Sequence, residues 1–244
     1  ATVIIIIALI LSYSRAAWLS VAFSLVVLFI VLLKIKFRYI LLTLSILVAL
    51  FFSLQNEIIS KLEKNKQDSS ADFVEHVQSI YNISSDASNL ERINRWQAAF
   101  RMFNERPFLG WGPGTYQFIY APYQHSKEKT IISTNAGDKG NAHSEYIGPL
   151  AEAGVLGLLT FFAIVVAVVY TGIKVFRKSL NNENSRLSLV FLISLMTYYL
   201  HGFLNNFLDT DKAAVPFWGF TAIIVALDIY HKNNDKGIND KKDS

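Results

Sequence analysis

Long runs of apolar residues constrain the fold of this 244-residue chain more than any other feature. A helix needs roughly 20 mostly apolar residues to cross the hydrocarbon core of a bilayer. Segments that reach or approach this length lie at 16–33, 37–54, 147–173, 187–207 and 213–230, and residues 1–11 have the same character but are too short to span alone. Backbone groups inside a bilayer have no water to bond to, so such segments form helices. We therefore predict an all-α integral membrane protein with about five to six transmembrane helices.

These segments divide the chain into four parts. We expect residues 1–54 to form transmembrane helices, the first of them truncated, so the chain would be the C-terminal portion of a larger membrane protein. Residues 55–146 form one long polar loop, and residues 147–230 hold three further transmembrane helices. The tail, residues 231–244, is rich in Lys and Asp and is predicted to be disordered and cytoplasmic.

Orientation follows from the basic residues, because short loops rich in Lys and Arg stay in the cytoplasm. The loops with this character contain Lys34, Lys36, Arg38, Lys174, Arg177 and Lys178. Counting spans from them puts the loop 55–146 on the outer side. Arg15, His143 and Asp209 then lie on that same side of the membrane.

Within the long loop, residues 88–104 have the pattern of an amphipathic helix. Ser88 and Glu91 have the spacing of a capping box. One face would carry Leu90, Ile93, Trp96, Gln97, Phe100 and Phe103, and the other Arg92 and Arg95. We expect this helix to lie on the membrane surface with its arginines toward an aqueous cavity. A second interpretation, that the arginines form an ordinary solvated face, stays open.

Several polar residues near the predicted outer boundary are candidates for a functional site. His143 lies where the polar loop meets an apolar helix, and a histidine can exchange a proton near neutral pH. Arg15 stands between two apolar runs, where an arginine usually faces a polar cavity and pairs with an anion. His201 and Asp209 lie eight residues apart, on one face of the fifth predicted span. Structural roles for these residues remain the alternative.

Composition excludes several other kinds of site. The formal net charge of +4 does not indicate nucleic-acid binding, and the absence of cysteine excludes disulfides and thiolate metal sites. His143 with Glu145 and Glu152 lacks the spacing of metal ligands, although the chain contains one Asp-x-Asp pair, Asp209-Thr210-Asp211. We therefore predict no metal site and no cofactor.

The residues that follow His143 resemble a known motif. His143-Ser144, nine further residues, Gly154, two residues and the small Gly157 are similar to the hallmark of the O-antigen ligase family of bacterial envelope glycosyltransferases. The pair Ser14-Arg15, the run Gly110-x-Gly112-x-Gly114 and the long outer loop are also similar to that family. The number of spans departs from it, since such proteins have about twice as many.

The resemblance implies a multi-pass enzyme of the bacterial inner (cytoplasmic) membrane with its active site on the periplasmic side. Its donor would be an undecaprenyl-diphosphate-linked glycan, and its acceptor a hydroxyl, on the lipid A core for a ligase. His143 would be the general base of an inverting, metal-independent transfer in lipopolysaccharide biosynthesis. Arg15, Arg92 and Arg95 would hold the diphosphate, with His201 and Asp209 as further substrate-binding residues.

Two alternatives to a ligase stay open. An O-antigen polymerase or a protein O-oligosaccharyltransferase would use the same donor with a different acceptor. A non-catalytic lipid-glycan transporter or flippase belongs to another functional class, and the same arginines could serve it equally well. His143 separates the classes, because only a transferase needs a base.

Overall fold

The computed structural model describes residues 2–12, 14–36, 38–43, 45–46, 49–50, 53, 87–130, 133, 140–178 and 182–240, and within them it is helical with no strand. Its helices are α1 (Thr2–Leu11), α2 (Arg15–Leu32), α5 (Ala87–Glu105), α6 (Tyr116–Ile119), α7 (Ile147–Lys178), α8 (Asn182–His201) and α9 (Asp211–Asp240). Short 3-10 turns are η2 (Ala121–Tyr123), η3 (Ser126–Glu128) and η4 (Phe207–Asp209). Of the span predicted at 37–54, residues 38–43, 45–46, 49–50 and 53 are described and helical, and the others lie outside the described residues.

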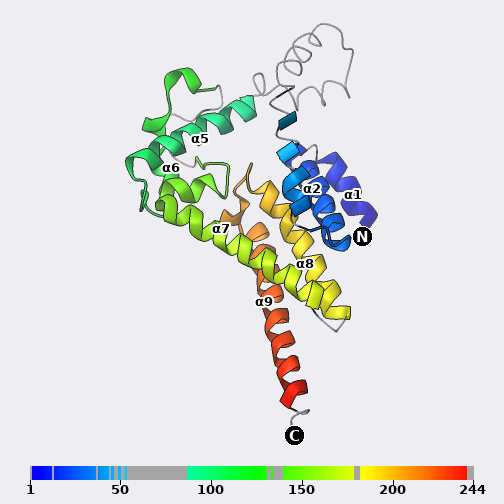
Figure 1. Cartoon of the computed structure of the whole chain (residues 1–244). Helices are drawn as coiled ribbons and strands as arrows, with labels where there is room; N and C mark the ends of the chain where they lie inside the picture. Colours follow the sequence, from blue (N-terminus) through cyan, green and yellow to red (C-terminus); the bar gives the residue numbers. More distant parts are fainter. Residues whose placement is uncertain are drawn as a thin grey trace, which may run out of the picture.

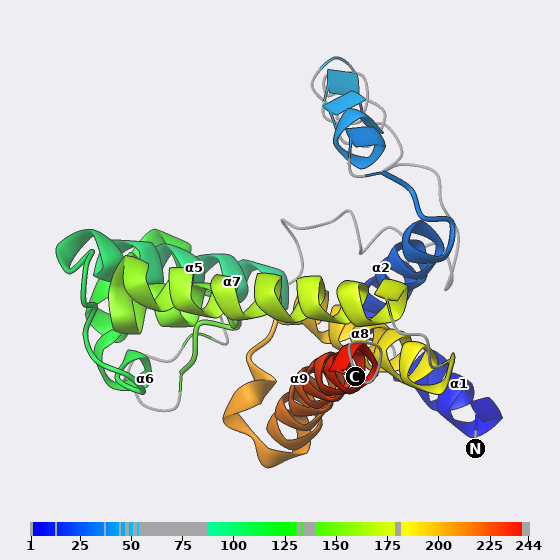
Figure 2. The same ribbon diagram turned by 60° about the horizontal axis from the view of Figure 1, so that its bottom comes forward.

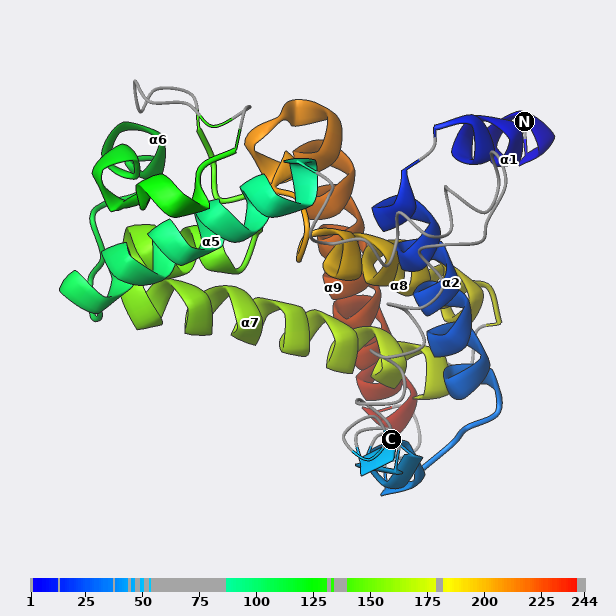
Figure 3. The same ribbon diagram turned by 90° about the horizontal axis from the view of Figure 1, so that it is seen from above.

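The helices form two layers. A bundle consists of α2, α8, α9 and the part of α7 beyond Gly154, and α8 packs against the other three helices. A cap consists of α5, α6, η2, η3, the loop 140–146 and the start of α7. Figure 1 shows α5 and α6 at one end of the molecule and the C-terminus of α9 at the other. Turned views show α5 lying along the first half of α7 (Figures 2 and 3).

The bundle has the surface of a membrane protein. Helix α7 and residues 211–230 of α9 are long and apolar enough to cross a bilayer, yet only 11% of each apolar window is buried. Leu156, Leu159 and Phe162 are among the side chains that α7 exposes. Outward-facing apolar side chains of this kind suit lipid rather than water. Helix α8 has 20 residues, as many as the apolar part of α9, but it is more polar, and α1 and α2 are shorter. The expected number of five to six transmembrane helices therefore stays a prediction.

The bundle holds together through an apolar core and a few polar contacts. The core residues of α7, α8 and α9 are Val168, Leu192, Leu195, Tyr199, Phe217 and Ile224. Where α7 and α8 approach closely, the Ser188 hydroxyl donates to the Gly172 carbonyl at 2.9 Å. An ion pair of 2.7 Å between Lys174 and Asp228 joins α7 to α9. The backbone of α9 is helical as far as Asp240, into the tail for which we expected disorder, since extending a formed helix is easy.

Helix α5 lies where a helix was predicted but buries a different face. The expected apolar face is only partly covered, and Phe100 is exposed. The buried face comprises Glu91, Asn94, Arg95, Ala98, Ala99 and Met102. Small alanines let α5 approach its neighbours closely, and the polar members find partners inside the protein. The expectation that Arg95 faces an aqueous cavity is therefore wrong, since its exposed fraction is 7%. The side chain of Ser88, and with it the capping box, lies outside the described residues.

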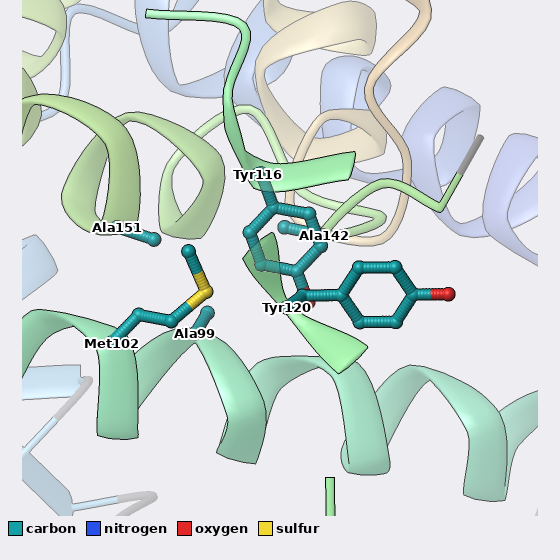
Figure 4. Close-up of a cluster of buried hydrophobic side chains, with 6 residues drawn as sticks. All are labelled: Ala99, Met102, Tyr116, Tyr120, Ala142 and Ala151. Atoms are coloured by element: carbon teal, nitrogen blue, oxygen red, sulfur yellow. The ribbon is translucent and has the colours of Figure 1, made fainter. Parts of the chain in front are cut away.

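A compact apolar cluster joins the parts of the cap. Figure 4 shows Met102 and Ala99 of α5 beside Ala151 of α7, with Tyr116, Tyr120 and Ala142 next to them. The rings of Tyr116 and Tyr120 stack at 5.2 Å. The Tyr116 hydroxyl donates to the Arg95 carbonyl at 2.8 Å. The cluster therefore ties α5 to the loop that carries His143.

Candidate functional site

A kink in α7 organises the site. Gly154 has φ +65° inside the helix, a conformation that side chains disfavour. A Cβ there would lie 2.5 Å from the carbonyl group of Phe108, so only glycine fits. Opposite it, a Cβ on Gly110 would lie 2.4 Å from the Glu152 carbonyl. The two glycines therefore allow the turn after α5 and the kink of α7 to pack backbone against backbone.

Backbone hydrogen bonds fasten this contact. The Val155 N–H donates to the Pro107 carbonyl at 2.8 Å, and the Gly112 N–H donates to the Glu152 carbonyl at 2.7 Å. The two carboxylate oxygens of Glu152 accept the N–H groups of Gly114 and Tyr116, each at 2.9 Å. The run Gly110-x-Gly112-x-Gly114 thus packs against α7 through its backbone.

The kink also explains the small residue three positions after Gly154. A Cβ on Gly157 would lie 2.6 Å from both the Ala153 Cβ and the Pro149 carbonyl oxygen. The glycine positions of the motif are therefore structural. They fix how α7 begins. They therefore also fix the position of His143, which lies four residues before the first residue of α7.

His143 is held in an unusual backbone conformation directly before α7. Its φ is +47°, and its N–H donates to the Asn141 side-chain oxygen at 3.1 Å, an Asx-type contact that suits such turns. Arg95 Nη1 donates to the Asn141 carbonyl at 3.2 Å. Ser144 Oγ accepts the N–H groups of Tyr146 and Ile147 at 3.3 Å each and so caps the start of α7. His143 is thus positioned from α5 on one side and from α7 on the other.

The surroundings of His143 keep its imidazole neutral. Burial, then the positive charges of Arg95 and Arg92, lower the pKa of His143 to about 4. At neutral pH the ring therefore carries no charge and has a nitrogen lone pair free of a proton. This is the protonation state that a general base requires.

Arg95 reaches this place as part of a buried ion pair. Its Nε donates to Glu91 at 2.7 Å, and its guanidinium lies 5.3 Å from the centre of the Tyr120 ring. Glu91 also accepts hydrogen bonds from Thr130 at 3.0 Å and from Ser133. Burial alone would raise the pKa of Glu91, but the Ser133 and Arg95 contacts outweigh it and hold that pKa below its ordinary value.

His201 and the start of α2 approach from the bundle. Arg92 acts electrostatically on both His143 and His201, so these three groups lie near one another. His201 Nε2 lies 3.2 Å from Asn205 Nδ2, and the ring interacts with the backbone of Ala16. Arg15 is the first residue of α2 and precedes Ala16, while its side chain lies outside the described residues.

Asp209 belongs to a neighbouring pocket. This pocket has a volume of about 430 Å³, and Asp209 is an exposed part of its wall, accepting a 2.7 Å hydrogen bond from Asn206. Asn141 and Ser144, on either side of His143, also line it, but His143 does not. The structure therefore brings Arg92, Arg95, His143 and His201 together, whereas Asp209 lines the neighbouring pocket.

Glu145 was missed as a partner in the site. It is buried, and its carboxylate accepts the Tyr198 hydroxyl at 2.6 Å and the Leu208 N–H at 2.8 Å. Burial, reinforced by the charge of Asp209, raises the pKa of Glu145 above its ordinary value despite these hydrogen bonds. An acidic residue at the mouth of a membrane helix is itself a signal for such a role.

Among the described residues, no three His, Asp or Glu side chains are close enough to hold a metal ion together. Independence from metal stays a prediction. Glu145 and Glu152 instead have the protein partners given above.

Comparison with protein families decides the broader identity. A family model described as O-antigen ligase matches residues 1–162, a range that includes His143, Gly154 and Gly157. The chain belongs to the O-antigen ligase family. The resemblance carried by the histidine motif is thereby confirmed. Members of the O-antigen ligase family are bacterial membrane proteins of the ligase and polymerase type, so the chain is a membrane enzyme of polysaccharide biosynthesis. A comparison with curated proteins gives no match.

Proposed function

We propose that this protein transfers a glycan from an undecaprenyl-diphosphate donor to an acceptor hydroxyl at the periplasmic face of the bacterial inner membrane. The arrangement that carries the proposal is His143, held before α7 by Asn141, beside Arg92 and Arg95, whose charges together with burial lower its pKa. A base next to fixed positive charge is what removal of a proton from a hydroxyl and departure of a diphosphate require together.

In the proposed reaction, His143 accepts the proton of the acceptor hydroxyl. The acceptor oxygen forms a bond to the anomeric carbon from the side opposite the diphosphate, and the bond from that carbon to the diphosphate oxygen breaks. The configuration inverts, and undecaprenyl diphosphate leaves with the bonding electron pair. Arg92, with Arg15 at the start of α2, stabilises the negative charge that develops, and the proton on His143 then passes to water. No metal ion is part of this scheme.

The donor would itself strengthen the base. The positive charges of Arg92 and Arg95 help to lower the pKa of His143. A diphosphate bound to Arg92 would offset part of that charge, so the pKa of His143 would rise toward its ordinary value of about 6.5. The imidazole would therefore accept a proton most readily when the donor is in place. Arg95, paired with Glu91, acts as a positioning residue through its bond to the Asn141 carbonyl.

The acceptor is proposed to be a sugar hydroxyl, on the lipid A core for a ligase. The pocket next to the His143 loop has the size for saccharide units, and its wall includes Asp209, Asn206 and Asn141. Carboxylate and amide groups of this kind bind sugar hydroxyls through hydrogen bonds. His201 would contact the donor side, because Arg92 lies near it. A polymerase or a protein O-oligosaccharyltransferase would differ only in what occupies the acceptor side.

The test is transfer from a defined undecaprenyl-diphosphate glycan by the full-length protein. We expect His143→Ala to lower the rate by roughly 10²–10⁴-fold while the protein accumulates in the membrane normally. Normal glycan products from this variant would instead favour the transporter class. Comparing lipid A core, glycan and peptide acceptors separates ligase, polymerase and protein transferase. Loss of activity in EDTA with recovery in magnesium would contradict the metal-free scheme.

The pH dependence gives a second arm to this test. In the free enzyme, kcat/KM should fall only as the pH approaches about 4, where His143 becomes protonated. Arg92→Gln removes a charge that lowers this pKa, so the acidic limb should move to higher pH. Arg101→Gln on the same helix is the matched control, since Arg101 is paired with Glu128 at 2.6 Å. An acidic limb that does not move in Arg92→Gln would count against His143 as the base.

A further inference from the structure

The turn that follows α5 exposes two large apolar side chains. Phe108 is 72% exposed and Leu109 is 76% exposed, the two highest values among the large apolar side chains that the structure describes. We call residues 106–112 the Phe108 turn. The Gly110 N–H donates to the Arg106 carbonyl at 3.1 Å, so the turn is closed. Its two apolar side chains therefore project from an ordered turn.

The Phe108 turn is fastened to α7 where the exposed apolar surface of that helix begins. Its bonds to α7 run from Val155 to the Pro107 carbonyl at 2.8 Å and from Trp111 to the Ala151 carbonyl at 3.3 Å. The next residue of α7, Leu156, is exposed, as are Leu159 and Phe162 further along the helix. Figures 1 and 2 show the chain leaving the end of α5 and turning beside the first half of α7. The apolar side chains of the turn thus continue the lipid-facing surface of α7.

Polar and aromatic groups flank these apolar side chains in the order expected at a bilayer boundary. The Arg106 guanidinium lies 3.9 Å from the centre of the Trp111 ring. Trp111 Nε1 donates to the Met102 carbonyl at 3.0 Å, so the indole is held in place. Tryptophan and arginine favour the headgroup region, where one part of the side chain is apolar and another is polar.

We propose that the Phe108 turn inserts into the outer leaflet of the membrane, with Phe108 and Leu109 among the acyl chains and Arg106 at the phosphate headgroups. A lipid partner fits better than a protein one because the turn is continuous with the membrane-facing side of α7. The insertion anchors the cap at a second point beside α7. It therefore fixes the height of the His143 loop above the bilayer. The importance of that height rests on the proposed function, but the insertion itself does not.

These 244 residues contain no cysteine, so a single-cysteine variant has one labelling site within them. Any cysteine elsewhere in the full-length protein would first be replaced by serine. The full-length protein with Leu109→Cys would be reconstituted in vesicles of phosphatidylethanolamine and phosphatidylglycerol. Collision of the nitroxide with oxygen, which concentrates in acyl chains, is compared with collision with a water-soluble nickel chelate. Leu159→Cys in α7 is the lipid control and Ser126→Cys in η3 the aqueous control, and both native residues are exposed. Phe108→Cys repeats the measurement at a second position.

We expect the oxygen-to-nickel ratio at position 109 to be close to that at 159 and several-fold above that at 126. A ratio equal to that at 126 would show that the turn lies in water and would overturn the proposal. An immobilised label that meets neither reagent would also overturn it, in favour of a protein contact. The measurement uses no glycan, so failure of the transferase proposal leaves its result unchanged.

Discussion

The cap and the bundle place their polar groups in opposite ways. In the cap, α5 buries Glu91, Asn94 and Arg95, and these side chains bond to one another and to Gln124, Thr130 and Asn141. In the bundle, α7 and α9 turn apolar side chains outward, and α8 keeps the isolated hydroxyl of Ser188 inside, against α7. The difference shows which solvent each layer meets. The cap can solvate its surface and uses buried charge to fix a loop, whereas the bundle has a surface made for lipid.

The largest expected effect concerns the joint between the two layers. Gly154→Ala would force a side chain into a left-handed conformation, at roughly 1–2 kcal/mol, and against the backbone of Phe108. We expect a total loss of about 3 kcal/mol or more, measured as thermal unfolding in detergent. Gly219→Ala in α9 is the control, because its Cβ meets nothing within 4 Å. That change should be neutral or stabilise the helix by up to about 1 kcal/mol. Equal losses of stability for the two variants would show that the contact between Gly154 and the turn at Phe108 is no more important than any other glycine position.

A smaller effect separates the two buried carboxylates of the cap. Glu91→Gln removes the anion beside the buried Arg95 but keeps an oxygen that can accept from it, so we expect a loss of about 1.5–3 kcal/mol at neutral pH. Glu145→Gln keeps an oxygen that can accept from Tyr198 and Leu208, and it should be tolerated. Chemical unfolding of both variants in the same detergent measures the difference.

The pH dependence of these two carboxylates should have opposite signs. The pKa of Glu91 is lowered, so its contribution is present above the ordinary carboxyl pKa and is lost as the pH falls through the lowered value. The pKa of Glu145 is raised, so its contribution is present at low pH and is lost as the pH rises through the raised value. Glu145→Gln should therefore reduce only the loss of stability that occurs as the pH rises. Parallel stability profiles for both variants would contradict this assignment.

The smallest effect lies in the bundle. Ser188→Ala removes one buried hydrogen bond between α7 and α8, and such bonds contribute about 0.6 kcal/mol in membrane proteins. Ser194→Ala on the same helix is the control, since its hydroxyl bonds to Val190 of its own helix. Unfolding free energies in detergent should differ by a fraction of a kcal/mol. A loss at Ser188 as large as that at Glu91 would mean that the bundle, too, depends on buried polar contacts.

Much of the class and of the candidate site could be predicted from residues alone. Apolar segments as long as a bilayer is thick allow only helices, and the capping and periodicity signals placed α5 within one residue at each end. The position of His143 before an apolar helix, with Gly154 and Gly157 behind it, indicated the family that the comparison then confirmed. These are local properties, set by the neighbouring residues and by the solvent.

The face that α5 buries could not be predicted in this way. Its apolar periodicity indicated one stripe, but the tertiary structure covers another, because Ala98 and Ala99 allow close approach and Thr130 and Ser133 supply partners for Glu91. Those partners lie about forty residues further along the chain. No local pattern reveals a partner at that distance, although it decides whether a buried charge is tolerated.

The sequence by itself thus determined a helical membrane enzyme with a candidate base at the mouth of a helix. Only the tertiary structure decided that Arg95 is paired with Glu91 rather than facing water, that Gly154 meets the turn at Phe108, and that Arg92 lies near both histidines. The physical reason is that periodicity and length report the solvent around each segment. Charge pairing and backbone contact depend on which distant segments meet.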